Sequence, residues 1–335
     1  MTISKKNFAG IDVSAETLDL VIRKKGKNHK VKKFKNTHDG HTSLIDWILK
    51  HNVSHICMEA TGIYHLDLAV TLDQTPALDV MVLNPKVARR FAEATMARNK
   101  TDAIDAGTLA QYADCMEFIV WTAPKLKVLQ IRACSRRLAA LSKQKVQAKN
   151  QLHALQATVH TPAQVIEDAE LTIEQLEKQI HNMEACALGL IQSDDEISNV
   201  LVLLISVKGI AETTAIQLIG ELLVLPKDMT PKQWAAYAGL DPRIIESGKS
   251  VSKKTRISKA GNFYLRKALY MPALSATRHE THVNAYYLHL INDNGLTKLQ
   301  AICAVMRKLL HAIHGMLKSG KTFDGSRFYV IPVQN

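Results

Sequence analysis

The sequence lacks any apolar run near the roughly 20 residues that a membrane-spanning helix needs. Its first residues do not predict a signal peptide, because Lys5 and Lys6 are followed by a mixed segment and not a long apolar one. The scattered cysteines contain no CxxC pair, which argues against a zinc site or a disulfide framework. They are Cys57, Cys115, Cys134, Cys186 and Cys303. We therefore expect a cytoplasmic protein with reduced thiols and no membrane partner.

The sequence has fewer acidic residues than basic ones. The 335 residues include 43 Lys and Arg against 31 Asp and Glu, a formal net charge of +12. Such a balance favours a polyanionic partner, with nucleic acid first and an anionic membrane surface second. Charge alone leaves a merely soluble basic protein open as an alternative. The length allows two or three domains and a sizeable core.

The first part of the chain reads as alternating strands and helices. Apolar alternation and buried runs predict strands at 8–13, 17–22, 31–34, 54–59 and 79–83, a helix at 42–51, and helices again from Lys86. Three strands, a helix, a strand, a helix, a strand and then helices is the order expected of a ribonuclease-H-like α/β fold.

Four acids stand at informative places in that pattern. Asp12 lies in the first strand amid apolar residues, and Glu59 ends another buried strand. The first and fourth strands are neighbours in a ribonuclease-H-like sheet, so these two carboxylates would lie side by side. Asp102 and Asp105, three residues apart, project from one face of a helix. If that helix packs across the sheet edge, all four carboxylates converge.

A cluster of buried carboxylates requires compensation, because a lone buried charge is costly unless it is paired or binds a metal. Oxygen ligands suit hard Mg²⁺ or Mn²⁺. Two such ions can activate and stabilise the oxygens of a phosphodiester displacement. Arg98 and Lys100, just before the helix, would steer or clamp an anionic backbone. For each acid alone, an ordinary surface or capping carboxylate is the alternative.

The middle of the chain predicts two long helices. Apolar residues recur at three-four spacing from Ile131 to Val159, with Lys145 the polar exception. Thr161 is expected to cap a second helix through a capping box with Gln164. A second seam then runs from Ile173 to Leu190. The pair would form a hairpin arm or an intermolecular coiled coil, and two ordinary core helices are the alternative.

The last part is mostly helical and strongly basic. Two apolar helices flank a turn at 208–210, resembling a helix-hairpin-helix that offers backbone N–H groups to a phosphate, although Ala211 stands where glycine is usual. A basic loop with a single acid, Glu246, follows. Its cations are Arg243, Lys249, Lys253, Lys254, Arg256, Lys259, Arg266 and Lys267. Phosphate contact is favoured over a solvated charge run. A second basic run, 23–35, is another candidate backbone contact.

These pieces carry a family resemblance. The stretches GIDVSAETLD, EATGIY, NKTDAIDA and SKAGNFYLRKALYMPA, with ESGKSV before the last, occur in order between about residues 8 and 320. Together they resemble the DEDD transposases of bacterial insertion sequences, a family that includes Piv-type DNA invertases and bridge-RNA-guided recombinases. A lysine that often follows the family's first aspartate is absent here.

The resemblance implies a fold of class α/β plus α. It consists of a RuvC-like metal-binding domain at 1–122, a coiled-coil helical linker at 123–192, and a mostly α-helical transposase domain at 193–335. Asp12, Glu59, Asp102 and Asp105 match the four acids of the RuvC-like domain. Ser247 matches the serine nucleophile, which without the resemblance would read as a turn residue.

The resemblance also implies an activity and its partners. The expected protein is a bacterial transposase or site-specific recombinase that acts at the nucleoid and links DNA to serine through a 5′-phosphate. It would bind donor and target double-stranded DNA and a non-coding guide RNA, and assemble from homodimers to a tetramer on DNA. A RuvC-like, metal-dependent, structure-specific endonuclease and a non-enzymatic nucleic-acid-binding protein are the alternatives.

Overall fold

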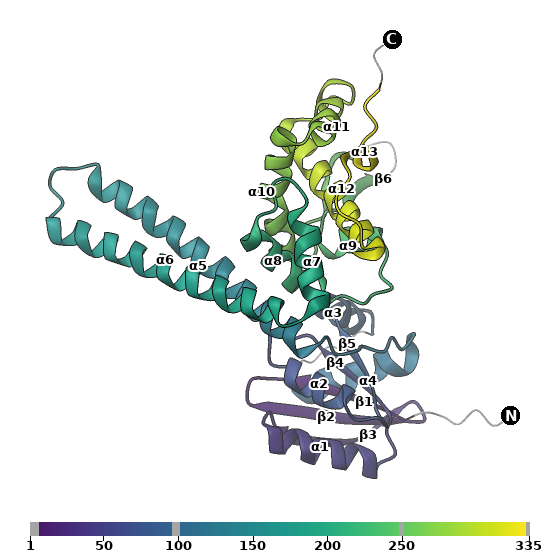
Figure 1. The fold of residues 1–335 in the computed structure, drawn as a ribbon. Helices are drawn as coiled ribbons and strands as arrows, with labels where there is room; N and C mark the ends of the chain where they lie inside the picture. Colours follow the sequence, from purple (N-terminus) through teal and green to yellow (C-terminus); the bar gives the residue numbers. More distant parts are fainter. Residues whose placement is uncertain (1–6, 96–100, 248–250, 333–335) are drawn as a thin grey trace. The chain divides into compact units, whose positions relative to one another are not determined.

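The computed structural model describes residues 7–95, 101–247 and 251–332 (Figure 1). The chain divides into two compact units, 1–123 and 124–335. Within the described part, no helix is long and apolar enough to cross a membrane.

The first unit is built on a mixed sheet. Its strands are β1 (Phe8–Val13), β2 (Thr17–Lys24), β3 (Lys27–Lys35), β4 (His55–Glu59) and β5 (Asp79–Leu83). They lie in the order β3-β2-β1-β4-β5, with β2 antiparallel to β1 and β3, and with β4 parallel to β1 and β5. The predicted neighbouring of the first and fourth strands is therefore confirmed.

The hairpin of β2 and β3 is longer than predicted. The sequence indicated strands only at 17–22 and 31–34, because the lysine-rich stretch between them has no apolar alternation. In the structure the ladder continues to a tight turn in which Lys25 and Gly26 both take positive φ, the geometry of a hairpin turn. Apart from buried Phe34, the side chains of β3 face solvent.

Helices cover both faces of this sheet. On one face α1 (His38–Lys50) and α2 (Leu66–Asp73) pack against a core that includes Ile11 and Ile56. On the other face α3 (Pro85–Ala94) and α4 (Asp102–Cys115) enclose a smaller core with Cys57 and Met81. The first helix begins before its predicted position because Thr37 caps it, accepting from the backbone N–H of Gly40.

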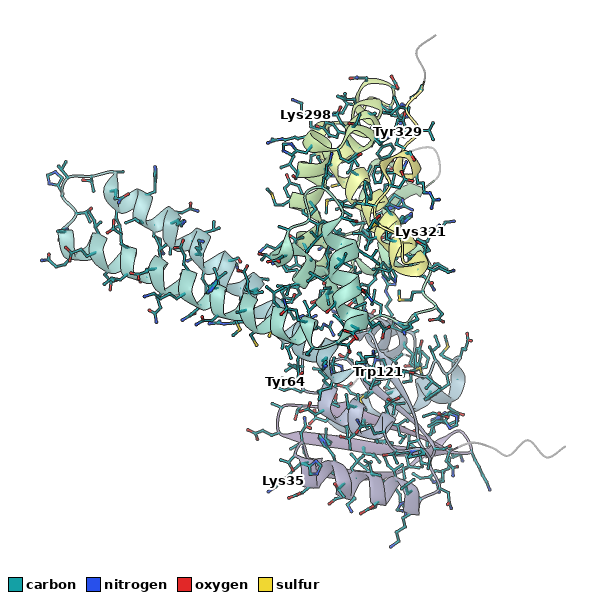
Figure 2. All side chains as sticks on the ribbon, in the orientation of Figure 1. Lys35, Tyr64, Trp121, Lys298, Lys321 and Tyr329 are labelled. Atoms are coloured by element: carbon teal, nitrogen blue, oxygen red, sulfur yellow. The ribbon has the colours of Figure 1, made fainter. Side chains whose placement is uncertain are left out.

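The second unit begins with a helical arm. Its helices α5 (Leu126–Gln156) and α6 (Ala163–Gln192) pack along each other as a hairpin (Figure 1). Lys145, the polar exception on the predicted apolar seam, forms an ion pair with Glu177 at 3.0 Å. Along most of the arm, side chains project into solvent (Figure 2).

Two details at the tip of the arm were predicted wrongly. The seam does not extend to Val159, which lies beyond the end of α5 and is 93% exposed. Thr161 does not cap α6, because its hydroxyl donates instead to the carbonyl of Leu155 at 2.7 Å. Pro162 occupies the cap position without a side-chain bond. A turn that closes back on the preceding helix therefore replaces the expected capping box.

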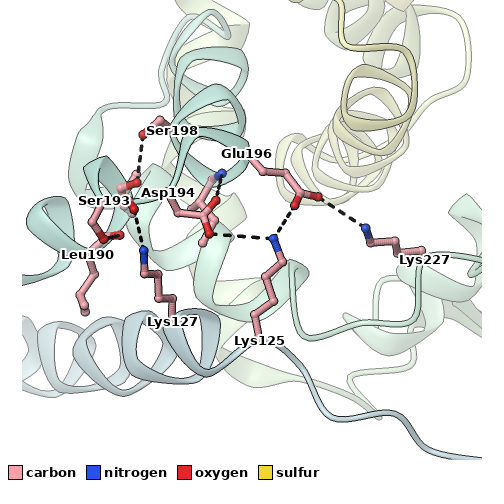
Figure 3. Close-up of polar contacts among 10 residues, drawn as sticks. Lys125, Lys127, Leu190, Ser193, Asp194, Glu196, Ser198 and Lys227 are labelled. Carbon is pink, nitrogen blue, oxygen red and sulfur yellow. Dashed lines mark hydrogen bonds and ion pairs between the residues drawn. The ribbon is translucent and has the colours of Figure 1, made fainter.

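The root of the arm is tied by charges to the helix that follows. Lys125 pairs with Glu196, and Lys227 reaches the same carboxylate at 3.4 Å (Figure 3). Lys127 donates to the carbonyl of Ser193 at 2.6 Å. These contacts hold the root of the arm against α7 (Asp195–Ile205).

The rest of the second unit is a helical body with one hairpin of strands. Its helices are α7, α8 (Glu212–Leu222), α9 (Pro231–Tyr237), α10 (Phe263–His279), α11 (Thr281–Asn292), α12 (Lys298–Ser319) and α13 (Gly325–Phe328). The basic segment predicted as a loop is a ribbon of two antiparallel strands, β6 (Pro242–Ser247) and β7 (Val251–Ile257). Their sequences, PRIIES and VSKKTRI, hold no regular alternation of apolar and polar residues, so the periodicity of the sequence did not indicate strands.

The predicted hairpin between apolar helices is present as α7, a turn and α8. Gly209 in the turn has φ +100°, a conformation that strongly favours glycine. A Cβ there would lie 2.8 Å from Ser275 Cβ, so the turn packs tightly against α10.

Candidate active site

Asp12 stands at the centre of the candidate site in the first unit. It is half-buried on β1, and its direct cross-strand partner on β2 is Asp19. Paired residues on antiparallel strands project from the same face of the sheet. Gly10, two residues before Asp12, faces α4, so both carboxylates lie on the α4 side.

A glycine on β1, Gly10, allows α4 to pack closely on the sheet. A Cβ built on Gly10 would clash with the backbone carbonyl of Ala106 and the backbone nitrogen of Ala110. Only glycine lets β1 and α4 approach this closely. The first turn of α4, capped by Thr101, carries Asp102 and Asp105. Close backbone packing therefore sets how near these acids lie to Asp12.

Glu59 reaches the same region from β4. Cys57, two residues earlier, packs in the core beneath α4, so the alternation of the strand places Glu59 on that face as well. Thr61 donates its hydroxyl to the Glu59 carboxylate at 3.3 Å.

The pKa of Asp12 reflects how closely the carboxylates are placed. Its pKa is raised from 3.8 to about 6, first by burial and then by the charges of other acids. Those acids are Asp105, Asp102, Glu59 and Asp19, in decreasing order of effect. The structure thus brings the four predicted acids within electrostatic reach of one another.

Sequence reasoning missed two members of this cluster, Asp19 and Lys33. Lys33 on β3 is the cross-strand neighbour of Asp19 and pairs with it at 3.2 Å. Its ammonium also lies 3.9 Å from Asp102. The sequence held one signal for Asp19. It is a charged residue inside the apolar run LDL of the second predicted strand, across the turn from Asp12.

The donor set fits a hard divalent cation, since clustered carboxylates that raise one another's pKa are relieved by a metal. Within residues 7–95, 101–247 and 251–332, no three His, Cys, Asp or Glu side chains are arranged as a formed metal site. The convergence of the four acids on one ion therefore stays a prediction. Arg98 and Lys100 lie outside the described residues.

The second unit holds the basic ribbon. Ser247 is the last residue of β6 and pairs in register with Val251, so it stands at the end of the ladder. Arg243 and Arg256 are exposed and pair directly across the ribbon. Like charges placed opposite each other on strands destabilise the pair, which favours a bound anion. Lys253 and Lys254 lie on β7, and Lys249 lies outside the described residues.

Three other predicted contact residues follow the ribbon. Lys259 and Lys267 are exposed. Arg266 is different, because its guanidinium donates to the carbonyl of Ala238 at 2.7 Å and is partly engaged inside the fold.

The root of the ribbon is fixed by a dense set of contacts. Asn262 caps α10, and its side-chain amide donates to Glu221 at 2.6 Å and to the hydroxyl of Tyr237 at 2.9 Å. A Cβ on Gly261 would meet the carbonyl of Tyr237. This explains physically why the stretch SKAGNF needs glycine and asparagine in adjacent positions.

Comparison with known proteins finds similar sequences along most of the chain. Residues 9–160 match a DEDD-type family model described as a transposase, and residues 202–288 match the model of the IS116/IS110/IS902 transposase family. The pilin gene-inverting protein of Moraxella bovis is 27% identical over 327 residues, which is 95% of this chain and 98% of that protein. Its namesake in Moraxella lacunata is 28% identical over 331 residues, with the same coverage. A putative transposase of Sinorhizobium fredii is 36% identical over 129 residues, 37% of this chain and 32% of its own.

Proposed function

Because this chain belongs to the IS116/IS110/IS902 transposase family, we propose that it is a DNA recombinase that cuts and rejoins DNA strands. The observation that carries the proposal is the crowding of carboxylates around Asp12, whose pKa is raised to about 6. Acids gathered at this cost to stability point to a functional site.

The four carboxylates Asp12, Glu59, Asp102 and Asp105 would hold Mg²⁺ or Mn²⁺. A bound divalent ion would neutralise phosphate charge and polarise the reacting oxygens. Lys33, between Asp19 and Asp102, balances part of the negative charge in its absence.

Ser247 would be the nucleophile. Its Oγ attacks a backbone phosphorus, the Ser–O–P bond forms, and the bond from phosphorus to the 3′ oxygen breaks. The hydroxyl proton ends on the leaving 3′ oxygen, through a neighbouring base. Reversal with a different 3′ hydroxyl rejoins the strand and frees the serine, so no external energy source is needed.

The basic ribbon would hold the phosphates during this exchange. Arg243 and Arg256 face each other without a neutralising acid between them in the register. A phosphate bound there would relieve their repulsion. Arg243 stands near the start of β6 and Ser247 at its end, so this pair would hold the DNA backbone at the other end of the ribbon from the serine. Support for this part of the proposal comes from charge placement along the ribbon.

Protomers would pair, first as dimers and then as a tetramer on double-stranded donor and target DNA, with a non-coding guide RNA selecting the sites. The arm offers a self-complementary surface. Its first helix contains seven Lys and Arg and no acid, whereas its second contains six Asp and Glu and a single Lys.

Sequencing the RNA that co-purifies with the protein tests for the guide RNA. Active protein that carries no RNA would refute the guide.

The central experiment looks for a covalent bond. Protein is incubated with DNA containing a recombination site and Mg²⁺, then denatured, and protein attached to DNA is measured. We expect an adduct that maps to Ser247 and disappears in Ser247→Ala. Free cut ends without an adduct would support a metal-dependent endonuclease instead, and intact DNA would support a binding protein.

A further inference from the structure

One face of α10 is apolar and aromatic yet exposed. Phe263, Lys267, Tyr270 and Met271 recur at the spacing of a single helix face. Phe263 is 60% exposed, Met271 62% and Tyr270 39%. The opposite face, with Leu265 and Leu269, is buried in the core. We call the four exposed residues, together with Tyr264, the aromatic stripe.

Cations frame this stripe. The guanidinium of Arg136 lies 4.8 Å from the centre of the Tyr264 ring. Lys267 is exposed in the middle of the stripe. Arg136 is already paired with the buried carboxylate of Glu221, so Lys267 supplies the positive charge that a ligand on this face would meet. A ligand that satisfies this surface must therefore combine flat apolar groups with negative charge.

Two copies of the chain are poor occupants for each other here. A two-fold contact of the stripe with itself would place Lys267 against its own copy, cation against cation. Base pairs inside a duplex hide the flat faces of their bases. Unpaired nucleotides expose both a stacking face and a phosphate.

We propose that the aromatic stripe is a binding site for unpaired DNA nucleotides, whose bases stack on Phe263, Tyr264 and Tyr270. Lys267 contacts a phosphate between them. The assignment rests on the proposed function in one respect: strand exchange separates DNA strands, and DNA is the partner that supplies them. The site would hold a separated strand away from its complement.

Binding affinities test the site. Fluorescence anisotropy is measured with an oligo-dT of about 15 nucleotides, a size that single-strand binders cover, with a duplex of equal length, and with oligo-U. Phe263→Ala and Tyr270→Ala are each expected to weaken oligo-dT binding about fivefold or more, with duplex binding and circular dichroism unchanged. Phe263→Trp should retain the affinity. Leu299→Ala, which removes an equally exposed apolar side chain on α12, is the control.

Salt dependence separates stacking from charge. Lys267→Gln should reduce the slope of log affinity against log salt by roughly 0.7, one phosphate contact on a single strand, whereas Phe263→Ala should leave the slope unchanged. A 5-iodouracil oligonucleotide should cross-link to the stripe.

Several results would overturn the inference. Unchanged oligo-dT affinity in the double variant Phe263→Ala, Tyr270→Ala, with duplex binding intact, removes the site while leaving the proposed function standing. Weakened oligo-U binding alone reassigns the stripe to RNA. Loss of self-association in place of DNA binding, seen by sedimentation, assigns it to a second copy. Failure of wild-type protein to bind duplex or single strand would refute the proposed function itself.

Discussion

The guanidinium of Arg136 on α5 donates two hydrogen bonds to the buried carboxylate of Glu221 on α8, at 2.8 Å and 3.2 Å. Arg132 reaches the same carboxylate at 3.4 Å, and Asn262 donates to it at 2.6 Å. Glu221 is fully buried. One carboxylate therefore joins α5 of the arm, α8 of the helical body and the residue that caps α10.

Removing that carboxylate should be costly. Glu221→Gln leaves two arginines without their counter-charge, and the expected loss of unfolding free energy is roughly 3–5 kcal/mol, lowered somewhat because Arg136 is partly exposed. Urea denaturation followed by circular dichroism measures it. Glu174→Gln, at an exposed pair with Lys178, is the matched control and should change little. Equal stability of the two variants would contradict a structural role for Glu221.

Asp12 should make metal-free protein less stable as pH rises. Its pKa is about 6 in the fold against an ordinary value of 3.8, so the native state binds the proton more tightly than the unfolded chain does. Stability then falls as pH increases from about 4 to about 6 and stays lowered above that range. In EDTA, Asp12→Asn should therefore melt higher than wild type at neutral pH and no higher near pH 4. Thermal melts across pH measure this.

Asp46→Asn, an exposed acid on α1, is the control for that experiment. Added Mg²⁺ should raise the melting temperature of wild type and not that of Asp105→Asn. A melting difference for Asp12→Asn that is independent of pH would mean that crowding of acids does not govern the residue.

Gly10→Ala should disrupt the packing of α4 on β1. The added methyl group would overlap the backbone of Ala106 and Ala110, and we expect a loss on the order of 1–3 kcal/mol. DNA cleavage should fall with it, because α4 carries Asp102 and Asp105. Gly189→Ala meets no atom within 4 Å on α6 and should stabilise its helix. Unfolding and cleavage are measured on both variants.

The contribution of Arg243 and Arg256 to DNA binding should be visible in the salt dependence of the affinity. Arg243→Gln and Arg256→Gln each remove one phosphate contact, so duplex affinity should fall and the salt slope should shrink by about one unit. Stability without DNA should hold or rise, since the two cations repel each other. Lys178→Gln on α6 is the control. A weaker affinity at unchanged slope would argue against phosphate contact.

Complementation tests whether the acids and the serine act across protomers. Ser247→Ala protein is mixed with Asp102→Asn protein under conditions that allow subunit exchange, and recombination is assayed. A site shared between protomers predicts partial rescue, because some mixed dimers join an intact serine to an intact acid cluster. Mixed dimers without any rescue would place both halves of the site in one chain.

The sheet was predictable because its strands carry strong local signals. Apolar strands such as β1 and β5 were bounded correctly, and the order of elements indicated their neighbours. The polar hairpin strand β3 and the ribbon strands lacked an apolar face, so their lengths depended on backbone pairing that periodicity does not report.

The candidate site was predictable in its residues and not in its surroundings. Asp12 and Glu59 stood out because each is a charge in a buried strand. Asp19 and Lys33 joined them through register, which depends on where the hairpin turns. The partners of Glu221 come from α5 and from the start of α10, so only folding brings them together.

The unequal charge of the two arm helices has a consequence during synthesis. The ribosome completes α5, with seven cations and no acid, before the six acids of α6 exist. Until Glu177 emerges, Lys145 and Lys149 have no carboxylate from the arm to pair with. A chain terminated after Gln156 would thus be a free polycation, able to adhere to any nearby nucleic acid. Completing the second helix supplies the carboxylate with which Lys145 and Lys149 pair in the folded arm.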